Sequence, residues 1–198
     1  MPTNHDILEA LDDLGRGLRL SFVWWADRYG HLISVVGPNG EAATVLSSIE
    51  GISDGGWPLS PPLQSLSIEY LAGGRHAALL VGMAGRSHWS ASVEAVPDRA
   101  ELLFDVACRL GQTPAKLSSR YSVSAGEIVS ARGDKERSVV EVRAEGRLLR
   151  IHREPIPGVD VVLRLPAGDI VIRPKLPEKL ASATVRWKYR VELVGSPV

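Results

Sequence analysis

Residues 66–96 read LSIEYLAGGRHAALLVGMAGRSHWSASVEAV, and this stretch decides the fold. It contains three runs of strand-forming residues, Leu66 to Leu71, Ala77 to Met83 and Trp89 to Val96, which are separated by short glycine-containing connections. Short connections of this kind join neighbouring strands in antiparallel order. The stretch therefore predicts a three-stranded antiparallel meander.

Strands are also predicted on the N-terminal side of this meander. Residues 18–25 alternate with a period of two, which is typical of a strand and places Trp24 and Trp25 on opposite faces. Two further strands, His31 to Val36 and Ala42 to Ser47, flank a turn that contains Asn-Gly, a pair that readily adopts the positive φ of tight turns. We expect a hairpin here.

Two segments have apolar residues at the spacing of a helix, residues 6–14 and residues 99–110. The apolar positions are Ile7, Leu8, Leu11 and Leu14 in the first, and Leu102, Leu103, Val106 and Leu110 in the second. A glycine follows each segment, as is common at the end of a helix. We therefore expect two amphipathic helices, the second covering one face of the meander.

The C-terminal part of the chain is expected to be nearly all β. Its predicted strands are Ile128 to Ala131, Ser138 to Ala144, Arg147 to His152, Asp160 to Leu165, Asp169 to Arg173 and Thr184 to Val194. The predicted fold class is α+β, mainly antiparallel β, with a helix-flanked meander followed by an all-β half that is a barrel or a sandwich. The expected domains are 1–124 and 125–198, separate or packed into the same fold.

The sequence W-x-x-x-V-E-x-V occurs in two predicted strands, at Trp89 to Val96 and at Trp187 to Val194. In an extended strand this pattern puts tryptophan and valine on one face and glutamate on the other. The two strands are either a duplicated unit or independent strands of the same type. In both cases each strand is expected to have a buried face.

Charge is distributed unevenly along a chain whose formal net charge is zero. Residues 1–124 carry 9 Lys and Arg against 13 Asp and Glu, and residues 125–198 carry 14 against 10. The halves could dock on each other, or the second could offer a basic binding face. Its basic residues are interleaved with acidic ones, so nucleic-acid binding is not expected.

Several classes of protein are excluded by composition. The longest apolar runs, such as Ala77 to Val81, are much shorter than the roughly 20 residues of a membrane-spanning helix. A single cysteine, Cys108, forms no internal disulfide, and the histidines lack metal-ligand spacing. We expect a cytoplasmic protein with no secretory signal, no membrane span, no metal and no cofactor.

Two blocks of sequence carry a resemblance, Leu80 to Glu94 and Phe104 to Arg109. They are similar to uncharacterised bacterial proteins of the planctomycete type, over roughly the middle third of the chain. No activity is attached to that family, so the resemblance implies no catalytic residue.

The segment from Gly82 to Trp89 is the most site-like part of the sequence. It combines glycines with Arg86, Ser87, His88 and Trp89. Backbone amides and an arginine could form a small anion pocket, although a plain hairpin loop explains the same residues. Ser87 and His88 are neighbours in an extended backbone, so they point in opposite directions and do not form a nucleophile and base pair.

The sequence contains no recognisable catalytic constellation. We therefore expect a non-catalytic protein-binding or assembly module, rather than an enzyme, that acts through a protein partner or self-association. The alternative is a small-molecule or anion-binding protein, or a hydrolase, with its site at Gly82 to Trp89. Fold class alone does not decide between these.

Overall fold

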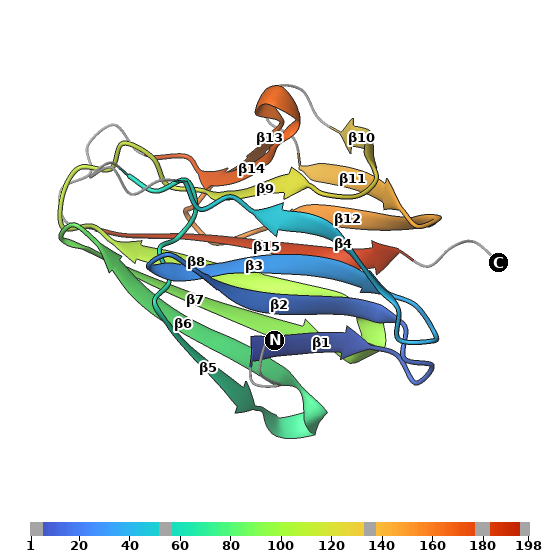
Figure 1. Ribbon diagram of the computed structural model, residues 1–198. Coiled ribbons are helices and arrows are strands. Elements are labelled where there is room, and N and C mark those ends of the chain that lie inside the picture. The colour runs from blue at the N-terminus through green and yellow to red at the C-terminus, as the bar shows by residue number, and fades with distance from the viewer. Residues whose placement is uncertain (1–5, 52–56, 133–137, 177–182, 195–198) are drawn as a thin grey trace.

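The computed structural model describes residues 6–51, 57–132, 138–176 and 183–194, and within them the chain forms two antiparallel β-sheets that face each other (Figure 1). One sheet has seven strands, in the order β1 (Ile7–Leu11), β2 (Gly17–Trp25), β3 (Arg28–Val36), β4 (Ala42–Ser48), β9 (Ser119–Val123), β14 (Ile170–Pro174) and β13 (Val161–Arg164). The other has eight, in the order β10 (Glu127–Arg132), β11 (Val139–Ala144), β12 (Arg147–Glu154), β15 (Thr184–Val194), β8 (Glu101–Arg109), β7 (Ser87–Val96), β6 (His76–Ala84) and β5 (Ser65–Tyr70).

The predicted meander is confirmed as β5, β6 and β7, which are adjacent in the eight-stranded sheet. Leu80 of β6 lies opposite Leu66 of β5 and Ala91 of β7. The hairpin of β3 and β4 and the six predicted strands of the C-terminal part are also present. Period-two alternation and turn chemistry therefore located most of the strands.

The predicted helix at 99–110 is wrong, because residues 101–109 form strand β8. Leu102, Phe104, Val106 and Cys108 are all buried and face the other sheet, whereas Leu103 lies on the opposite face. A short apolar run can satisfy both periodicities, and only pairing with other strands decides between them. Here β8 pairs with β7 on one side and β15 on the other.

The predicted helix at 6–14 is also wrong, because residues 7–11 form strand β1, which pairs with β2. Leu8 and Ala10 are fully buried opposite Leu20 and Leu18. The described residues contain no α-helix, only the short 3-10 turns η2 (Ala72–Gly74), η3 (Pro97–Arg99) and η4 (Pro166–Gly168). The fold is therefore almost entirely β rather than α+β with a helix-flanked meander. No described helix has the length and apolar character needed to cross a membrane.

Strands from both sides of residue 124 pair within the same sheets. Strand β8 pairs with β15 in the eight-stranded sheet, and β9, which was not predicted, pairs with β14 in the other. Ion pairs also join the two parts of the chain, as between Arg120 and Asp169, which are 2.6 Å apart. The opposite charges of the two parts thus meet in direct contacts.

The space between the sheets is filled by one hydrophobic core in which aromatic side chains are prominent. Phe104 of β8 and Tyr189 of β15 stack with ring centroids 4.7 Å apart and an interplanar angle of 5°. Trp89 and Trp187, from the two strands that share the W-x-x-x-V-E-x-V pattern, contact each other edge to face at 6.1 Å. Both of these strands contribute a buried face, as the sequence predicted.

The strand at residues 101–109 and the expected helix differ in which side chains they bury. The strand buries Phe104 and places Leu103 on the outer face, whereas the helix would have buried Leu103. Phe104→Ala should lower the free energy of unfolding by about 3–5 kcal/mol, because it leaves a cavity in the core. Leu103→Ala should cost only about 1 kcal/mol, because this side chain is on the outer face. Urea unfolding of both variants measures the difference. Equal losses, or a larger loss for Leu103→Ala, would contradict the strand.

Candidate functional site

The four residues predicted to form a site do not share one surface. Ser87 and Trp89 are buried between the sheets, whereas Arg86 and His88 are exposed. The Ser87 Oγ accepts a hydrogen bond from the amide of Gly111 at 3.1 Å, and the Trp89 indole packs between Trp57 and Trp187. The alternation of strand β7 thus buries Ser87 and Trp89 and turns His88 outward, whereas Arg86 lies in the turn that precedes this strand.

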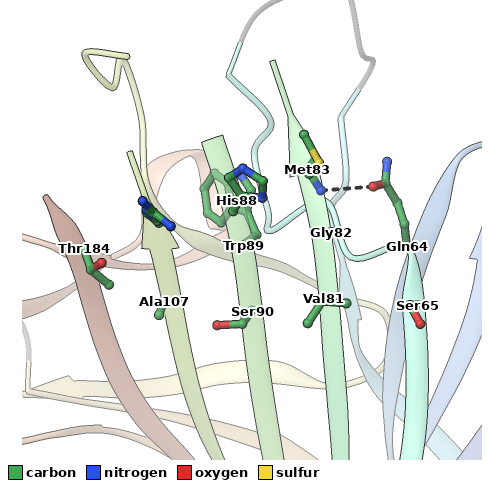
Figure 2. A pocket seen from close by; sticks show the side chains of 11 residues that line it. Gln64, Ser65, Val81, Gly82, Met83, His88, Trp89, Ser90, Ala107 and Thr184 are labelled. Atoms are coloured by element: carbon green, nitrogen blue, oxygen red, sulfur yellow. Dashed lines mark hydrogen bonds between the residues drawn. The ribbon is translucent and has the colours of Figure 1, made fainter. Parts of the chain in front are cut away.

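His88 lies in a groove on the outer face of the eight-stranded sheet (Figure 2), with a volume of about 550 Å³. Strands β6, β7, β8 and β15 form its floor, and Gln64 and Ser65 border it at the sheet edge. The Gln64 side chain accepts a hydrogen bond from the amide of Met83 at 3.0 Å, which holds this border in place. The groove is therefore built on strands and not on a mobile loop.

A row of four side chains crosses the groove, contributed by residues in register on four adjacent strands. Met83 is opposite His88, His88 is opposite Arg109, and Arg109 is opposite Thr184. Directly opposed residues in a sheet have Cβ atoms about 4.5–5.5 Å apart, so neighbouring side chains in this row can contact one ligand together. The row combines an apolar side chain, an imidazole, a guanidinium and a hydroxyl.

Arg109 is exposed in this groove and has no ion pair or side-chain hydrogen bond to any described residue. The other arginines on the outer strand faces of this sheet whose side chains are described do have acidic partners. These pairs are Arg143 with Glu127, Arg150 with Glu141, Arg186 with Asp105, and Arg190 with Glu101. The charge of Arg109 is thus available to a ligand.

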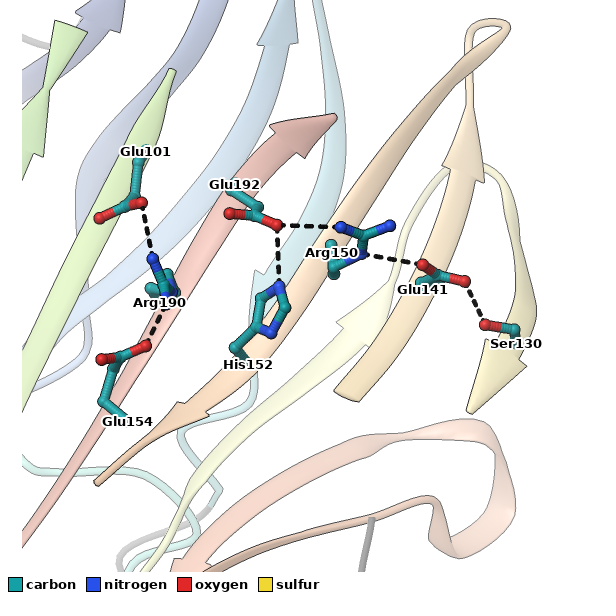
Figure 3. A network of polar contacts seen from close by, with 8 residues as sticks. All are labelled: Glu101, Ser130, Glu141, Arg150, His152, Glu154, Arg190 and Glu192. Carbon is teal, nitrogen blue, oxygen red and sulfur yellow. Dashed lines mark hydrogen bonds and ion pairs between the residues drawn. The ribbon is translucent and has the colours of Figure 1, made fainter. Parts of the chain in front are cut away.

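The remainder of this face carries a network of polar contacts (Figure 3). Arg150 Nε is 2.8 Å from Glu141, and Arg150 Nη1 is 3.3 Å from Glu192, whose carboxylate also lies 2.8 Å from His152 Nε2. Arg190 contacts Glu101 and Glu154 at 3.2 and 2.7 Å. Each of these two arginines thus has two carboxylate partners, which distinguishes this part of the face from the groove around Arg109.

A second pocket, of about 530 Å³, lies on the outer face of the seven-stranded sheet. Val23 and Trp25 of β2 and Leu32 of β3 give it apolar walls, and Ser47 of β4 adds a hydroxyl. Glu50, two residues beyond the end of β4, also lines it. The two pockets are on opposite outer faces of the sandwich and differ in their charged residue, arginine in one and glutamate in the other.

Glu50 is a buried carboxyl group whose charge is poorly compensated. Its side chain accepts a hydrogen bond from Ser48 Oγ at 2.6 Å through Oε1, but Oε2 has no partner among the described residues. Burial raises the pKa of Glu50 to about 7, against a smaller opposing effect of the Ser48 hydrogen bond and of Arg28. Arg28 is itself paired with Asp27, at 2.7 Å.

His31, whose backbone amide donates to Ser48 Oγ, begins a chain of buried hydrogen bonds between the sheets. Its Nε2 is 2.7 Å from the hydroxyl of Tyr121, which is 2.6 Å from the hydroxyl of Tyr189. Burial lowers the pKa of His31 to about 4, so the ring is neutral at neutral pH. Burial also raises the pKa of both tyrosines, which keeps their hydroxyl protons available for these bonds.

No group of three or more potential metal ligands is found in the part of the chain that the structure describes. Cys108 is buried in the core, and burial raises the pKa of its thiol to about 12. A protonated, inaccessible thiol is a poor nucleophile and a poor ligand. This side chain therefore packs as a small hydrophobic group.

The sequence reasoning missed Arg109 and Glu50. Arg109 was placed on a helix, although the alternation of Leu102, Phe104 and Val106 would have put it at the outward-facing end of a strand. Glu50 follows a strand in a segment with no recognisable motif. Its burial depends on the packing of that segment against β3 and β9, which no local pattern encodes.

The comparisons with known proteins give a likeness of fold. No protein-family model matches the sequence, and no curated protein matches it. Among solved structures, the chain is similar to a heparinase III with methylated lysines, with a TM-score of 0.51 and 10% sequence identity. The match covers 97% of this chain and 36% of that one, so the likeness concerns about a third of the heparinase chain.

Burial of Glu50 makes the stability of the protein depend on pH. The pKa of the Glu50 carboxyl rises from 4.5 to about 7 on folding, so its ionisation is easier in the unfolded chain. The free energy of unfolding therefore decreases as pH increases from 4.5 to 7. Glu50→Gln should therefore match the wild type near pH 4.5 and exceed its free energy of unfolding by up to about 3 kcal/mol at pH 8. Urea unfolding across this range tests the expectation.

The exposed Glu145 provides a matched control for this substitution. Glu145→Gln removes the same charge from a turn and should leave the pH dependence of stability unchanged. If the two variants have the same profile, or if Glu50→Gln is less stable than the wild type at pH 8, ionisation of Glu50 does not destabilise the fold.

His31 should produce the opposite pH dependence. Its pKa falls from 6.5 to about 4 on folding, so its contribution to stability is complete above pH 6.5 and decreases as pH falls towards 4. In the wild type this change opposes that of Glu50. In Glu50→Gln protein it should be visible as a loss of stability between pH 6.5 and 4.5. A flat profile in that variant would show that His31 becomes charged without cost.

Proposed function

We propose that this protein is a ligand-binding β-sandwich module that holds an anionic group in the groove on its eight-stranded sheet, with Arg109 as the principal contact. The observation that carries the proposal is the guanidinium of Arg109, which lines the groove without a described partner, on a face where the other described strand arginines have acidic partners. His88 and Thr184 flank it in register.

The side chains of the groove suit a molecule that has both an anionic and an apolar part. A guanidinium can donate two parallel hydrogen bonds to a carboxylate, sulfate or phosphate, and the hydroxyls of Ser90 and Thr184 can donate further ones. Val81 and Met83 are exposed beside this polar row and offer apolar surface to the body of the ligand. The ligand class is therefore an acidic small molecule or an acidic saccharide.

This proposal develops the small-molecule alternative from the sequence, but with a different set of residues. His88 remains in the site, Arg109 replaces Arg86 as the anion contact, and Ser87 and Trp89 support the strand from within the core. Catalysis is not part of the proposal. A protein partner, self-association and a cytoplasmic location stay predictions.

Heparin is a suitable first probe, because it is strongly anionic and because the similar solved structure is named as a heparinase. We expect a heparin oligosaccharide to bind with an affinity that decreases as salt concentration rises. Arg109→Gln should weaken binding about tenfold, the order expected for losing one charge-assisted hydrogen-bonding group. Isothermal titration calorimetry at low and moderate salt measures both effects.

The matched control is Arg99→Gln, which removes an exposed arginine without a described partner at the other end of the β7–β8 hairpin. It should leave the affinity nearly unchanged, as should Ser87→Ala, which instead lowers stability by about 1 kcal/mol through loss of the Gly111 hydrogen bond. Equal effects of the two arginine substitutions would indicate nonspecific attraction, and no binding of heparin, citrate or sulfate would contradict the anion site.

A further inference from the structure

The pocket on the seven-stranded sheet has chemistry different from that of the groove and is independent of the function proposed above. It lies on the opposite outer face, and its walls are contributed by β2, β3, β4 and the segment that follows β4. Among the residues that the structure describes, Glu50 is the acidic residue that lines it, and none of its described lining residues is arginine or lysine. An anionic ligand would therefore be repelled here.

An indole forms the exposed wall of this pocket. Trp25 is 67% exposed and lies with Val23 on the outer face of β2, where both line the pocket. The neighbouring Trp24 projects to the other side of the strand and packs edge to face on Tyr29, at 5.0 Å. Trp24 therefore has an aromatic contact on its own side of the strand, and Trp25 is the indole that lines the pocket.

The acidic group of the pocket forms no ion pair with a described residue. Glu50 is 8% exposed, and its Oε2 has no hydrogen-bond partner among the described residues. The nearby guanidinium of Arg28 makes two hydrogen bonds to Asp27, at 2.7 and 3.0 Å, and acts on Glu50 through its charge without a hydrogen bond or ion pair to it. A buried carboxylate is normally paired, so a donor with positive charge is the component that this arrangement is missing.

We infer that this pocket binds a small organic ammonium ion, whose nitrogen pairs with Glu50 and whose apolar body lies against Trp25 and Val23. A carboxylate and an ammonium group form a strong charge-assisted hydrogen bond, especially where water is excluded. The face of an indole attracts a cation and also covers an apolar body. These two elements are the complement of an alkylammonium ion.

Binding of such an ion should be coupled to protonation of Glu50. The charged and titratable groups around this carboxyl are Asp27, just before β3, Arg28 and His31 in β3, Tyr121 of β9 and Tyr189 of β15. His31 and Tyr121 are neutral near pH 7, and the hydrogen bond from Arg28 lowers the pKa of Asp27. Glu50 is therefore the group in this set whose charge changes between pH 6 and 8.

Cyclohexylamine and cyclohexanol form a matched pair of probes, because they have similar size and only the amine carries a positive charge. Calorimetric titration of the full chain at pH 8 should show binding of cyclohexylamine at least tenfold tighter than that of cyclohexanol. Between pH 8 and pH 6 the affinity for the amine should decrease about tenfold, as Glu50 takes up a proton with a pKa of about 7. The affinity for cyclohexanol should not change.

Two substitutions test the named contacts. Glu50→Gln should abolish the preference for the amine and its pH dependence, and unfolding measurements at pH 8 confirm that this variant is folded. Trp25→Ala should weaken the binding of both probes at least fivefold. Glu145→Gln and Trp24→Ala are the controls, and both should retain the wild-type preference for the amine.

Three results would overturn the inference. One is equal affinity for the two probes, which would indicate a merely apolar pocket. Another is an amine affinity that Glu50→Gln leaves intact. The third is absence of amine binding to the wild type at pH 8. If a neutral saccharide such as methyl glucoside then binds, the pocket is a site for a neutral ligand.

Discussion

The contact between strand β15 of one sheet and strand β9 of the other is the interaction on which the rest of the structure depends. Tyr189 and Tyr121 meet through their hydroxyls at 2.6 Å, and the indole of Trp187 donates a hydrogen bond to Ser119 Oγ at 3.1 Å. Trp187, Tyr121 and Tyr189 are among the largest fully buried side chains. They combine extensive apolar burial with polar groups that are satisfied only when both sheets are in place. The relative position of the sheets is thereby fixed.

Once these side chains face inward, alternation determines the outward face of every paired strand. In β15 the inward Trp187 and Tyr189 leave Thr184, Arg186 and Arg190 on the surface. In β8 the inward Phe104 leaves Arg109 beside Thr184 in the groove. A shift of one residue in register would bury the arginines and expose the aromatic rings, so core packing and the positions of the groove residues are set together.

The two outer faces acquire different properties from these constraints. On the eight-stranded sheet, acidic residues pair with most described strand arginines, and Arg109 has no described partner. On the seven-stranded sheet, an exposed tryptophan borders a carboxyl group that forms no ion pair with a described residue. The proposed ligands follow from this difference: an anion would pair with Arg109 on one face, and an ammonium ion would pair with Glu50 on the other.

Much of the fold was accessible from the sequence alone, because strand periodicity and turn chemistry are local properties. The meander around residues 66–96, the hairpin at Asn39-Gly40 and the C-terminal strands were all predicted from them. The segments at 7–11 and 101–109 satisfied two periodicities, and only hydrogen bonding to strands distant in the sequence made them strands. His88 was identified as a candidate contact, but Arg109 and Glu50 were not. Their roles depend on charges and burial contributed by other strands, which tertiary packing alone brings together.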